Sequence, residues 1–358
     1  MPATQFSTGV SIVICCHNSA TRLPQMLPYL RAQEVPSGLC WEVVVVDNAS
    51  TDGTAQIARE LWLANMKAPL RIVDEPRLGL SFARQTGFKE ARYEYVSFLD
   101  DDNWAAPNWV QTVNEVMTRH SEVGACGGYS EAVFESEPPS WFENHKIYYA
   151  VGPDWGDPAS PSYRDLLWGA GLTIRKSAWR QLVDNSFRFR LIGRQGTKLL
   201  AGEDTELCFA LRLNGWRLYY DPRLRLRHYM CAARLQWSHL RKLYRGDGKA
   251  SVDLDAYGFA LATNDASLKL RLKMTWQWQA LAVIKRLAGQ PSKSLTALCG
   301  LAEGDSGVTW VESQIGRLVR LLQLRGKYNS SVRQMQHFAL NNENRDNFAV
   351  TQLKRKVS

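Results

Sequence analysis

One short stretch constrains the fold more than any other. The apolar run Tyr95–Leu99 stops abruptly at three consecutive carboxylates, Asp100, Asp101 and Asp102. The run consists largely of β-branched and aromatic residues, which is the composition of a strand, and Asn103 behind it is a turn signal. The acids are therefore expected on a loop at the carboxyl end of a strand, where open α/β sheets bind their ligands.

The three adjacent carboxylates repel one another and need a positive partner. A divalent cation is the economical choice. Asp100 and Asp102 alternate along the chain, so they are spaced to reach one hard cation that also takes phosphate oxygens. The alternative is a solvated acidic turn, and the surrounding sequence decides between the two.

Three apolar runs precede this stretch and alternate with helical patterns. Strands are expected at 11–16, 41–46 and 71–73, and their continuous apolar character is typical of a buried parallel sheet. Right-handed crossovers then bring the strand ends to one edge of the sheet. Polar side chains at or after those ends are His17, Asn18, Asp47 and Arg77, and Arg84 lies on the following helix.

Missing motifs argue against two common nucleotide-binding classes. No GxGxxG follows the first strand, and no GxxxxGK[ST] occurs anywhere in the chain. A dinucleotide-binding Rossmann domain and a P-loop NTPase are therefore both disfavoured.

Further strands and one helix are predicted before residue 230. The stretch 134–163 is irregular and aromatic, which is typical of a functional loop. Strands are expected at 123–133, 168–174, 216–222 and 224–229, and a helix with acids in its first turn opens at 203.

The charge changes sign near the end of this region. The 358 residues are 45% hydrophobic, enough for one large core or two modest ones. From Pro222 onward, 23 Lys and Arg stand against 9 Asp and Glu, and helical patterns dominate. The run 268–279 alternates apolar and polar residues as a strand does, but its continuation favours a helix. A boundary is placed near residue 230, and the tail 341–358 is polar.

The composition also bears on location. No run reaches the length of a membrane span, and the first residues do not resemble a secretory signal. Seven cysteines without a CxxC pair favour reduced thiols in a cytosolic protein.

Six motifs, in order along the chain, resemble those of the family 2 glycosyltransferases, which have the GT-A fold. The later motifs resemble most those of bacterial members that build exopolysaccharides. The resemblance covers about residues 9–230, whereas 235–358 match no family. It is carried by Ile12–Asn18, Val44–Thr54, Leu78–Gly87, Phe98–Asn103, Trp168–Leu172 and Gly202–Leu207, and by Arg227-His228.

This resemblance implies a fold and a division of the chain. The fold is α/β, a GT-A mixed and mainly parallel sheet with helices on both faces, followed by a mostly helical C-terminal region. Residues 1–230 would be the catalytic domain, with a donor half at about 9–104 and an acceptor half at about 105–230. Residues 231–340 would be the basic helical region.

The resemblance also implies an activity. It is inverting transfer of one sugar from a nucleotide-diphospho-sugar, a UDP-sugar foremost, to a glycan or lipid-linked acceptor. The cofactor would be Mn²⁺ or Mg²⁺. The processive signature is present only as the fragment Leu235-Gln236-Trp237, so transfer of a single residue is expected.

Site residues follow from the same resemblance. The metal ligands would be Asp100, Asp102 and His228. Donor contacts would be Cys16, His17, Asn18, Asp47, Arg77, Arg84, Asp100 and Asp101. Acceptor contacts would be Trp141, Trp168, Gly169, Ala170, Gly171 and Glu203.

Asp204 would be the catalytic base, since the like charge of Glu203 would raise its pKa. One departure is Gln85, where the family usually has Asn after the arginine. Structural alternatives remain for these residues: a helix cap for Asp47, a helix-terminal acid for Asp204, a surface ion pair for each arginine, and core packing for His228 and Trp168.

The basic second half suggests peripheral contact with the inner face of the plasma membrane. The residues involved would be Lys269, Arg271, Lys273, Trp276 and Trp278. Three other functions compete with the transferase. A nucleic-acid-binding protein lacks a recognised motif here, a nucleotidyltransferase lacks its Gly-rich Arg-containing loop, and a non-catalytic nucleotide-sugar-binding subunit would not need the DDD and GED motifs.

Overall fold

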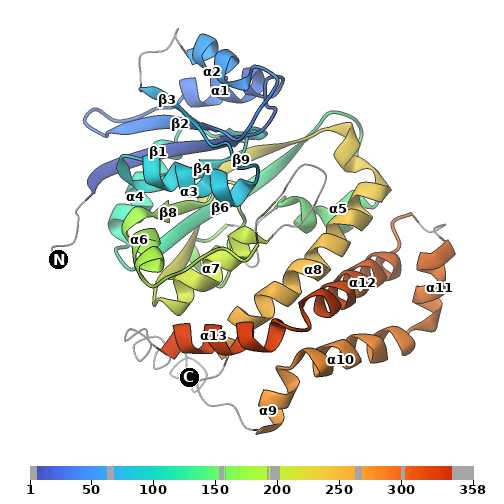
Figure 1. Cartoon of the computed structure of the whole chain (residues 1–358). Helices are drawn as coiled ribbons and strands as arrows, with labels where there is room; N and C mark the ends of the chain where they lie inside the picture. The colour runs from blue at the N-terminus through green and yellow to red at the C-terminus, as the bar shows by residue number, and fades with distance from the viewer. Residues whose placement is uncertain are drawn as a thin grey trace.

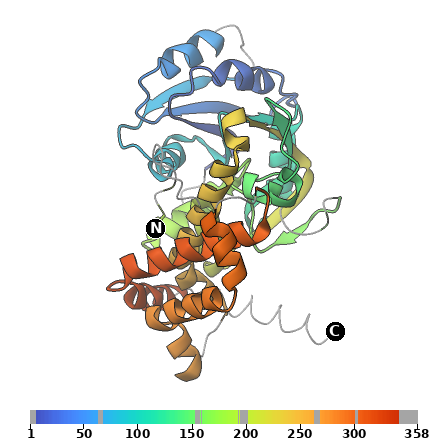
Figure 2. The ribbon, with the colours of Figure 1, turned by 90° about the vertical axis from the view of Figure 1, so that its right-hand side faces the viewer.

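A computed structural model describes residues 6–62, 68–152, 157, 159–191, 193, 202–262, 268–299 and 303–340. The first part of the chain forms one sheet flanked by helices, and the later helices gather at one end of it (Figures 1 and 2). The polar tail predicted at 341–358 lies outside the described residues.

The first half of the sheet follows the predicted alternation. Strands β3, β2, β1 and β4 are neighbours in that order, and all are parallel. The elements are β1 (Ser7–Cys16), α1 (Leu23–Arg31), β2 (Trp41–Asp47), α2 (Thr54–Trp62), β3 (Leu70–Asp74), α3 (Leu80–Glu90) and β4 (Tyr93–Leu99).

Alternate residues of these strands enter two different cores. Ile12 and Ile14 of β1 pack with α1, α2 and α4, whereas Val13 between them packs with α3, α6 and α7. Successive side chains of a strand point to opposite faces. Helices therefore cover both faces of the sheet, as predicted.

The second half of the sheet is mixed. Strand β8 is antiparallel to β4 and β6, while the long β6–β9 pairing is parallel. Short strands β5 and β7 both pair antiparallel to β9. The elements are β5 (Asn103–Ala105), α4 (Trp109–Arg119), β6 (Val123–Phe134), α5 (Phe142–His145), the 3-10 helix η1 (Lys146–Tyr149), β7 (Ser162–Arg164), β8 (Thr173–Arg175), α6 (Lys176–Asp184), α7 (Glu203–Leu213) and β9 (Arg217–Met230).

Two local predictions were wrong. The segment 168–172 is irregular, and of the strand predicted at 168–174 only Thr173 and Ile174 lie in a strand, β8. Gly171 has φ +74°, and a Cβ there would lie 2.5 Å from the ring of Trp109, so the chain turns where extension was expected. The two strands predicted around Pro222 form the single strand β9, because Pro222 does not interrupt it.

The region after Met230 is helical, and the run 268–279 forms helices, as favoured. A break between α9 and α10 is capped by Thr275, whose side chain accepts from the Trp278 N–H. The elements are η2 (Ala232–Leu235), α8 (Trp237–Ala262), α9 (Leu268–Lys273), α10 (Trp276–Ala288), α11 (Pro291–Cys299), α12 (Ser306–Leu324) and α13 (Tyr328–Leu340).

Helices α8 and α12 cross at two glycines. A Cβ at Gly248 would lie 2.0 Å from the carbonyl oxygen of Ser313, and one at Gly316 would lie 2.1 Å from that of Arg245. Only glycine permits such an approach of backbones. Helix α12 therefore packs on one side of α8, and the opposite side of α8 faces the sheet region (Figure 1).

Helix α8 is also tied directly to α7. The hydroxyl of Tyr257 donates to the buried Glu206 carboxylate at 2.8 Å. A Cβ at Gly202, one residue before α7, would lie 3.2 Å from the Cβ of Ala250. The start of α7 therefore lies directly against α8.

Candidate active site

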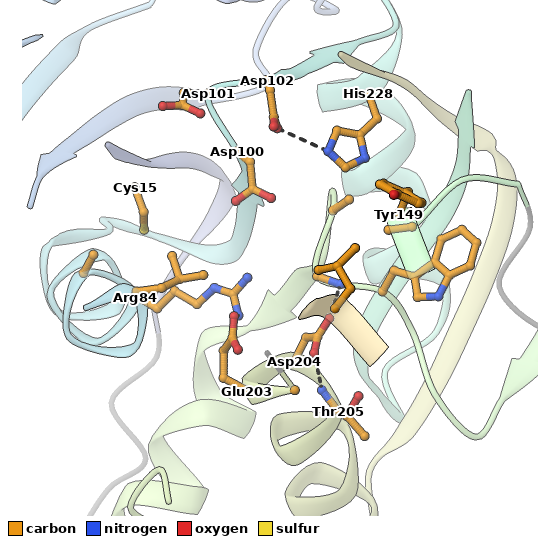
Figure 3. Close-up of a pocket in the computed structure, with 18 of the residues that line it drawn as sticks. Cys15, Arg84, Asp100, Asp101, Asp102, Tyr149, Glu203, Asp204, Thr205 and His228 are labelled. Carbon is orange, nitrogen blue, oxygen red and sulfur yellow. Dashed lines mark hydrogen bonds and ion pairs between the residues drawn. The ribbon is translucent and has the colours of Figure 1, made fainter. Parts of the chain in front are cut away.

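A cavity of about 790 Å³ opens at the carboxyl ends of β1 and β4. Figure 3 shows side chains from the two ends, from the start of α7 and from β9 converging on it. Of the predicted site residues, twelve line the cavity: Cys16, His17, Arg84, Asp100, Asp101, Asp102, Trp168, Gly169, Ala170, Glu203, Asp204 and His228.

Arginines compensate the three adjacent carboxylates. Arg22 forms an ion pair with Asp101 at 2.7 Å, and Arg234 forms one with Asp102 at 2.8 Å. The buried Arg84 interacts electrostatically with Asp100. The positive partner that the sequence demanded is therefore supplied in part by the chain itself.

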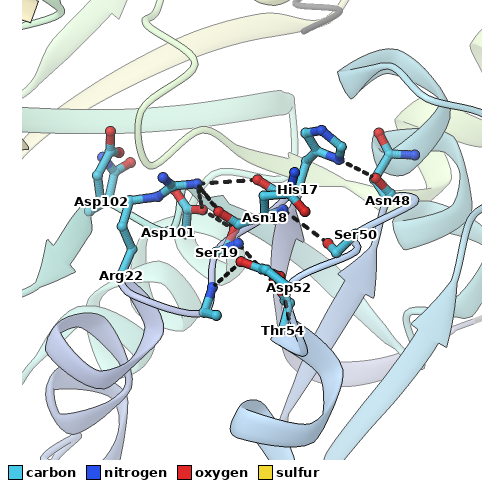
Figure 4. A network of polar contacts seen from close by, with 12 residues as sticks. His17, Asn18, Ser19, Arg22, Asn48, Ser50, Asp52, Thr54, Asp101 and Asp102 are labelled. Carbon is cyan, nitrogen blue, oxygen red and sulfur yellow. Dashed lines mark hydrogen bonds and ion pairs between the residues drawn. The ribbon is translucent and has the colours of Figure 1, made fainter. Parts of the chain in front are cut away.

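Asp101 lines the cavity, but its carboxylate is bound by neighbouring side chains of the chain itself. The Ser19 hydroxyl and the Arg22 guanidinium both donate to its Oδ2 (Figure 4). Burial raises the pKa of Asp101, the Arg22 bond lowers it, and the charge of Asp102 raises it again, with a net upward shift. Asp101 therefore connects the loop after β4 to Ser19 and Arg22, which follow β1.

The ends of β1 and β2 are joined by a network of polar contacts. The ring Nδ1 of His17 lies 2.8 Å from the carbonyl oxygen of Asn48, and the Asn18 N–H donates to Ser50 at 3.0 Å (Figure 4). The Asn48 side chain donates to the carbonyl of Arg77 at 2.7 Å. These hydrogen bonds connect loops that are far apart in sequence, next to the cavity.

Asp102, His228 and Arg234 form a compact group. The Nε2 of His228 lies 3.5 Å from one oxygen of Asp102, and Arg234 Nη1 lies 2.8 Å from the other. The same Nη1 lies 3.2 Å from His228 Nε2. A neutral imidazole can accept there, and its other nitrogen, Nδ1, is buried without a hydrogen-bond partner in the described part of the chain.

The group fits a divalent cation only in part. Among the described residues, no three His, Cys, Asp or Glu side chains gather as a metal-holding set. Asp102 and His228 nevertheless present an oxygen and a nitrogen to one point, and Mg²⁺-like ions often take only one or two protein ligands besides phosphate oxygens. The guanidinium of Arg234 now lies at that point.

Arg84 lies at the base of the cavity and pairs with Glu203. The Arg84 Nη1 is 3.4 Å from Glu203 Oε1, and both side chains are buried. Burial opposes the charged guanidinium, but the carboxylates of Glu203, Asp100 and Asp204 raise the pKa of Arg84 overall. The ion pair also compensates the Glu203 charge that was expected to act on Asp204.

Asp204 is oriented by backbone groups. Its Oδ2 accepts from the Gly169 N–H at 2.8 Å, and its Oδ1 accepts from the Thr205 N–H at 2.7 Å (Figure 3). A Cβ at Gly169 would lie 2.9 Å from Oδ2 and 3.0 Å from Arg84 Nη2. Glycine at position 169 therefore lets the 168–172 loop approach α7 without displacing the ends of these two side chains.

Helix α8 and the segment 147–150 close the other side of the cavity. Leu243, Asp247, Ala250 and Leu254 of α8 line it, as does Tyr148. Asp247 is exposed toward the cavity, where partial loss of solvent and the nearby like charge of Asp204 raise its pKa. No functional role was predicted for α8 or for Asp247.

Five predicted residues do not line the cavity. Arg77 pairs with Glu75 at 2.8 Å on the surface, and Asp47 accepts from the Ser50 N–H at 3.2 Å. Asn18 connects the loops after β1 and β2, because its Oδ1 accepts from the Thr51 N–H at 2.9 Å. Gly171 packs on Trp109. Trp141 is buried and donates to Glu303 at 2.9 Å, which places it in a core rather than on a sugar.

Three residues of the site were missed: Arg22, Arg234 and Asp247. A signal existed for Arg234, because it immediately precedes the Leu235-Gln236-Trp237 fragment. Arg22 and Asp247 carry no motif, since each reaches the site only through tertiary packing.

Comparison with known proteins identifies a matching family and related sequences. Residues 11–169 match the sequence profile of glycosyl transferase family 2. The poly-beta-1,6-N-acetyl-D-glucosamine synthase of Staphylococcus epidermidis is 30% identical over 216 residues, 60% of this chain and 48% of that protein. The glucosyl-dolichyl phosphate glucuronosyltransferase of Haloferax volcanii is 24% identical over 187 residues, 51% of this chain and 58% of that protein. The chain spans less than two thirds of the length of either relative.

A solved structure extends the likeness to the fold. The mannosyltransferase PcManGT from Pyrobaculum calidifontis, in complex with GDP-Man and Mn²⁺, aligns over 91% of this chain and 89% of its own, with a TM-score of 0.52 and 18% identity. The predicted GT-A fold with a helical C-terminal region is confirmed.

Proposed function

The chain carries a glycosyltransferase family 2 domain over residues 11–169, and from this premise we propose that it transfers one sugar from a nucleotide-diphospho-sugar to an acceptor hydroxyl. The observation that carries the proposal is the arrangement of a single cavity. It holds Asp102 and His228 on one side and an oriented carboxylate, Asp204, at the start of α7. The first side would serve the leaving diphosphate, and the second would serve the attacking hydroxyl.

The donor side provides charge compensation for the leaving group. Asp102 and His228 would hold a divalent metal, Mn²⁺ or Mg²⁺, which supplies Lewis-acid neutralisation of a departing diphosphate. Arg84 lies at the base of the same cavity as a permanent cation. Arg234 pairs with Asp102 in this structure, so it would compete with a metal for that carboxylate, and its guanidinium can also donate to phosphate oxygens.

The acceptor side provides the base. A hydroxyl oxygen of the acceptor forms a bond to the anomeric carbon while the bond from that carbon to the diphosphate oxygen breaks. Asp204 takes the hydroxyl proton. A single displacement of this kind inverts the anomeric centre. The Gly169 N–H fixes Asp204 Oδ2 in the ground state, so the base is pre-oriented.

The acceptor is proposed to be a glycan or lipid-linked sugar in surface polysaccharide synthesis. Trp168 and Tyr148 line the cavity with aromatic side chains against which a sugar would pack, and Asp247 offers a carboxylate to its hydroxyl groups. One relative is named as a poly-beta-1,6-N-acetyl-D-glucosamine synthase. The donor is proposed to be a UDP-sugar, with GDP-sugars next, and the site of action the inner face of the plasma membrane.

A donor screen tests the proposal. The purified chain is incubated with UDP-, GDP- and dTDP-sugars and either Mn²⁺ or Mg²⁺, and hydrolysis is followed by mass spectrometry, with Asp204→Asn as the control. Slow metal-dependent hydrolysis of one donor is expected. Donor binding without any turnover, with or without acceptor, would instead identify a non-catalytic nucleotide-sugar-binding subunit. Absence of both would refute the proposal.

A further inference from the structure

The outer surface of the helical region is unusually apolar. Five large hydrophobic side chains of α9, α10 and α11 are between 46% and 63% exposed. They are Leu272, Trp278, Leu281, Ile284 and Leu295, here called the outer apolar face. Single exposed hydrophobic residues are ordinary, but five on consecutive helices need an explanation.

Helix α10 is apolar on two sides at once. Ala280 and Val283 are buried against the rest of the protein. Trp278, Leu281 and Ile284, spaced three residues apart, follow one another along the exposed side. A helix that packs one side in a core normally turns polar residues outward, so the second apolar side is built to meet something other than water.

The charge on this segment has one sign. Residues 268–299 contain six Lys and Arg and no Asp or Glu. Five of the six are described with their side chains, and all five are exposed: Arg271, Lys273, Lys285, Arg286 and Lys293. Apolar side chains bordered by basic ones match the chemistry of an anionic bilayer surface, where the apolar groups enter the interface and the cations meet the headgroups.

Other occupants fit less well. A second copy of the face would bring two purely basic surfaces together, which costs electrostatic free energy. A nucleic acid would meet the charge but gain little from exposed Leu and Ile side chains. None of the described helices is both long and apolar enough to cross a bilayer.

We propose that the outer apolar face, with its surrounding lysines and arginines, docks on an anionic lipid bilayer. The lipid location rests on the proposed function, in which the acceptor is assembled at a membrane; the docking surface itself is independent of the transfer chemistry. Trp276, predicted to take part, is half-buried and packs on the core, whereas Trp278 is exposed. Helix α12 lies between α10 and α8 (Figure 1), so docking leaves the cavity wall of α8 undisturbed.

The test is co-sedimentation of the full chain with vesicles of phosphatidylcholine alone or with 30% phosphatidylglycerol, about the fraction that gives a strongly anionic surface, at low and high salt. Two variants change the face: Leu281→Glu with Ile284→Glu, and Lys285→Glu with Arg286→Glu. The matched control is Val183→Glu, which alters a side chain that is 47% exposed on α6, remote from this face.

Wild type and the control should bind the anionic vesicles and lose binding as salt rises. The basic-pair variant should bind at least about 30-fold more weakly, since each nearby cation contributes roughly 1 kcal/mol. The apolar variant should lose binding. Circular dichroism and donor hydrolysis in solution should be unchanged in all of them.

Two results would overturn the inference. One is that wild type sediments with no vesicle at low salt. The other is that both variants bind as well as wild type. If vesicle binding fails and the apolar variant converts a dimer to a monomer in free solution, the face is a contact between copies instead. Vesicle binding in a chain that hydrolyses no donor would leave this inference standing and remove the proposed function.

Discussion

Glu206 gives the stability of this protein a predictable dependence on pH. Its carboxylate is buried and accepts the N–H groups of Arg190 and Leu191 and the hydroxyl of Tyr257. Burial raises the pKa of Glu206 from 4.5 to about 7, against the lowering effect of those hydrogen bonds. The group joins α7 to α8 and therefore reports on the contact that positions Asp204.

The sign follows from the raised pKa. Between pH 4.5 and 7 the folded protein keeps the Glu206 proton while the unfolded chain releases it. The contribution of Glu206 to folding stability is therefore fully present below pH 4.5 and is lost as pH rises through 7. One pKa unit corresponds to about 1.4 kcal/mol, so Glu206 should remove about 3 kcal/mol between pH 4.5 and pH 8.

The perturbation is Glu206→Gln, which keeps a carbonyl oxygen for the two N–H groups and cannot titrate. In a cooperative unit of 358 residues, about 3 kcal/mol corresponds to roughly 4 °C in Tm. Thermal and urea unfolding are measured at pH 4.5, 6 and 8 for wild type, for Glu206→Gln and for the control Glu131→Gln. Glu131 of β6 has a side chain that is 42% exposed and pairs with Arg225 on the surface.

From pH 4.5 to pH 8, the free energy of unfolding of wild type should fall by about 3 kcal/mol relative to that of Glu206→Gln. The free energy of unfolding of Glu131→Gln should follow the same pH dependence as that of wild type. Parallel profiles for wild type and Glu206→Gln would refute the reasoning, because they would mean that the carboxyl titrates at the same pH in the folded and unfolded chain.

Four further predictions concern the cavity. Asp102→Asn should abolish Mn²⁺-dependent donor binding without altering the fold; calorimetry that finds unchanged affinity in Mn²⁺ would remove the metal assignment. Asp204→Asn should lower kcat by about 10²–10⁴-fold at unchanged donor affinity, and an equal loss of donor affinity would make it a binding residue. Arg234→Gln should tighten Mn²⁺ binding in the absence of donor by about 5- to 10-fold, as followed by electron paramagnetic resonance, and weaker binding would contradict the competition. Asp247→Asn should raise the acceptor KM by about 10- to 100-fold with donor hydrolysis intact; an unchanged KM would place Asp247 outside the acceptor site.

The parallel half of the sheet could be predicted because its signals are local. Val43–Val46 is apolar without interruption and fully buried, and such a run fits only a strand covered on both faces. Loops offered no equivalent signal. The segment 168–172 looked like a strand, yet the need of Gly171 for a positive φ beside Trp109 is visible only when both are in place.

Charge compensation at Asp100–Asp102 shows what a sequence leaves open. Three adjacent acids require positive charge, and that part of the prediction follows from Coulomb's law alone. Whether an ion or a side chain supplies it depends on groups far along the chain: Arg22 is about 80 residues away and Arg234 about 130. Neither distance in sequence carries information about distance in space.

The role of α8 was out of reach for a related reason. An acid in a long polar helix ordinarily lies on a solvated face, and Asp247 has that appearance in sequence. Close contacts at three glycines instead direct this part of α8 toward the cavity. Gly248 and Gly316 let α12 press on one side of α8, and Gly202 lets the other side meet the start of α7. Because these contacts hold α8 on both sides, the carboxylate of Asp247 faces the same cavity as Asp204. The helical region therefore forms part of the site, although no motif in it indicates a function.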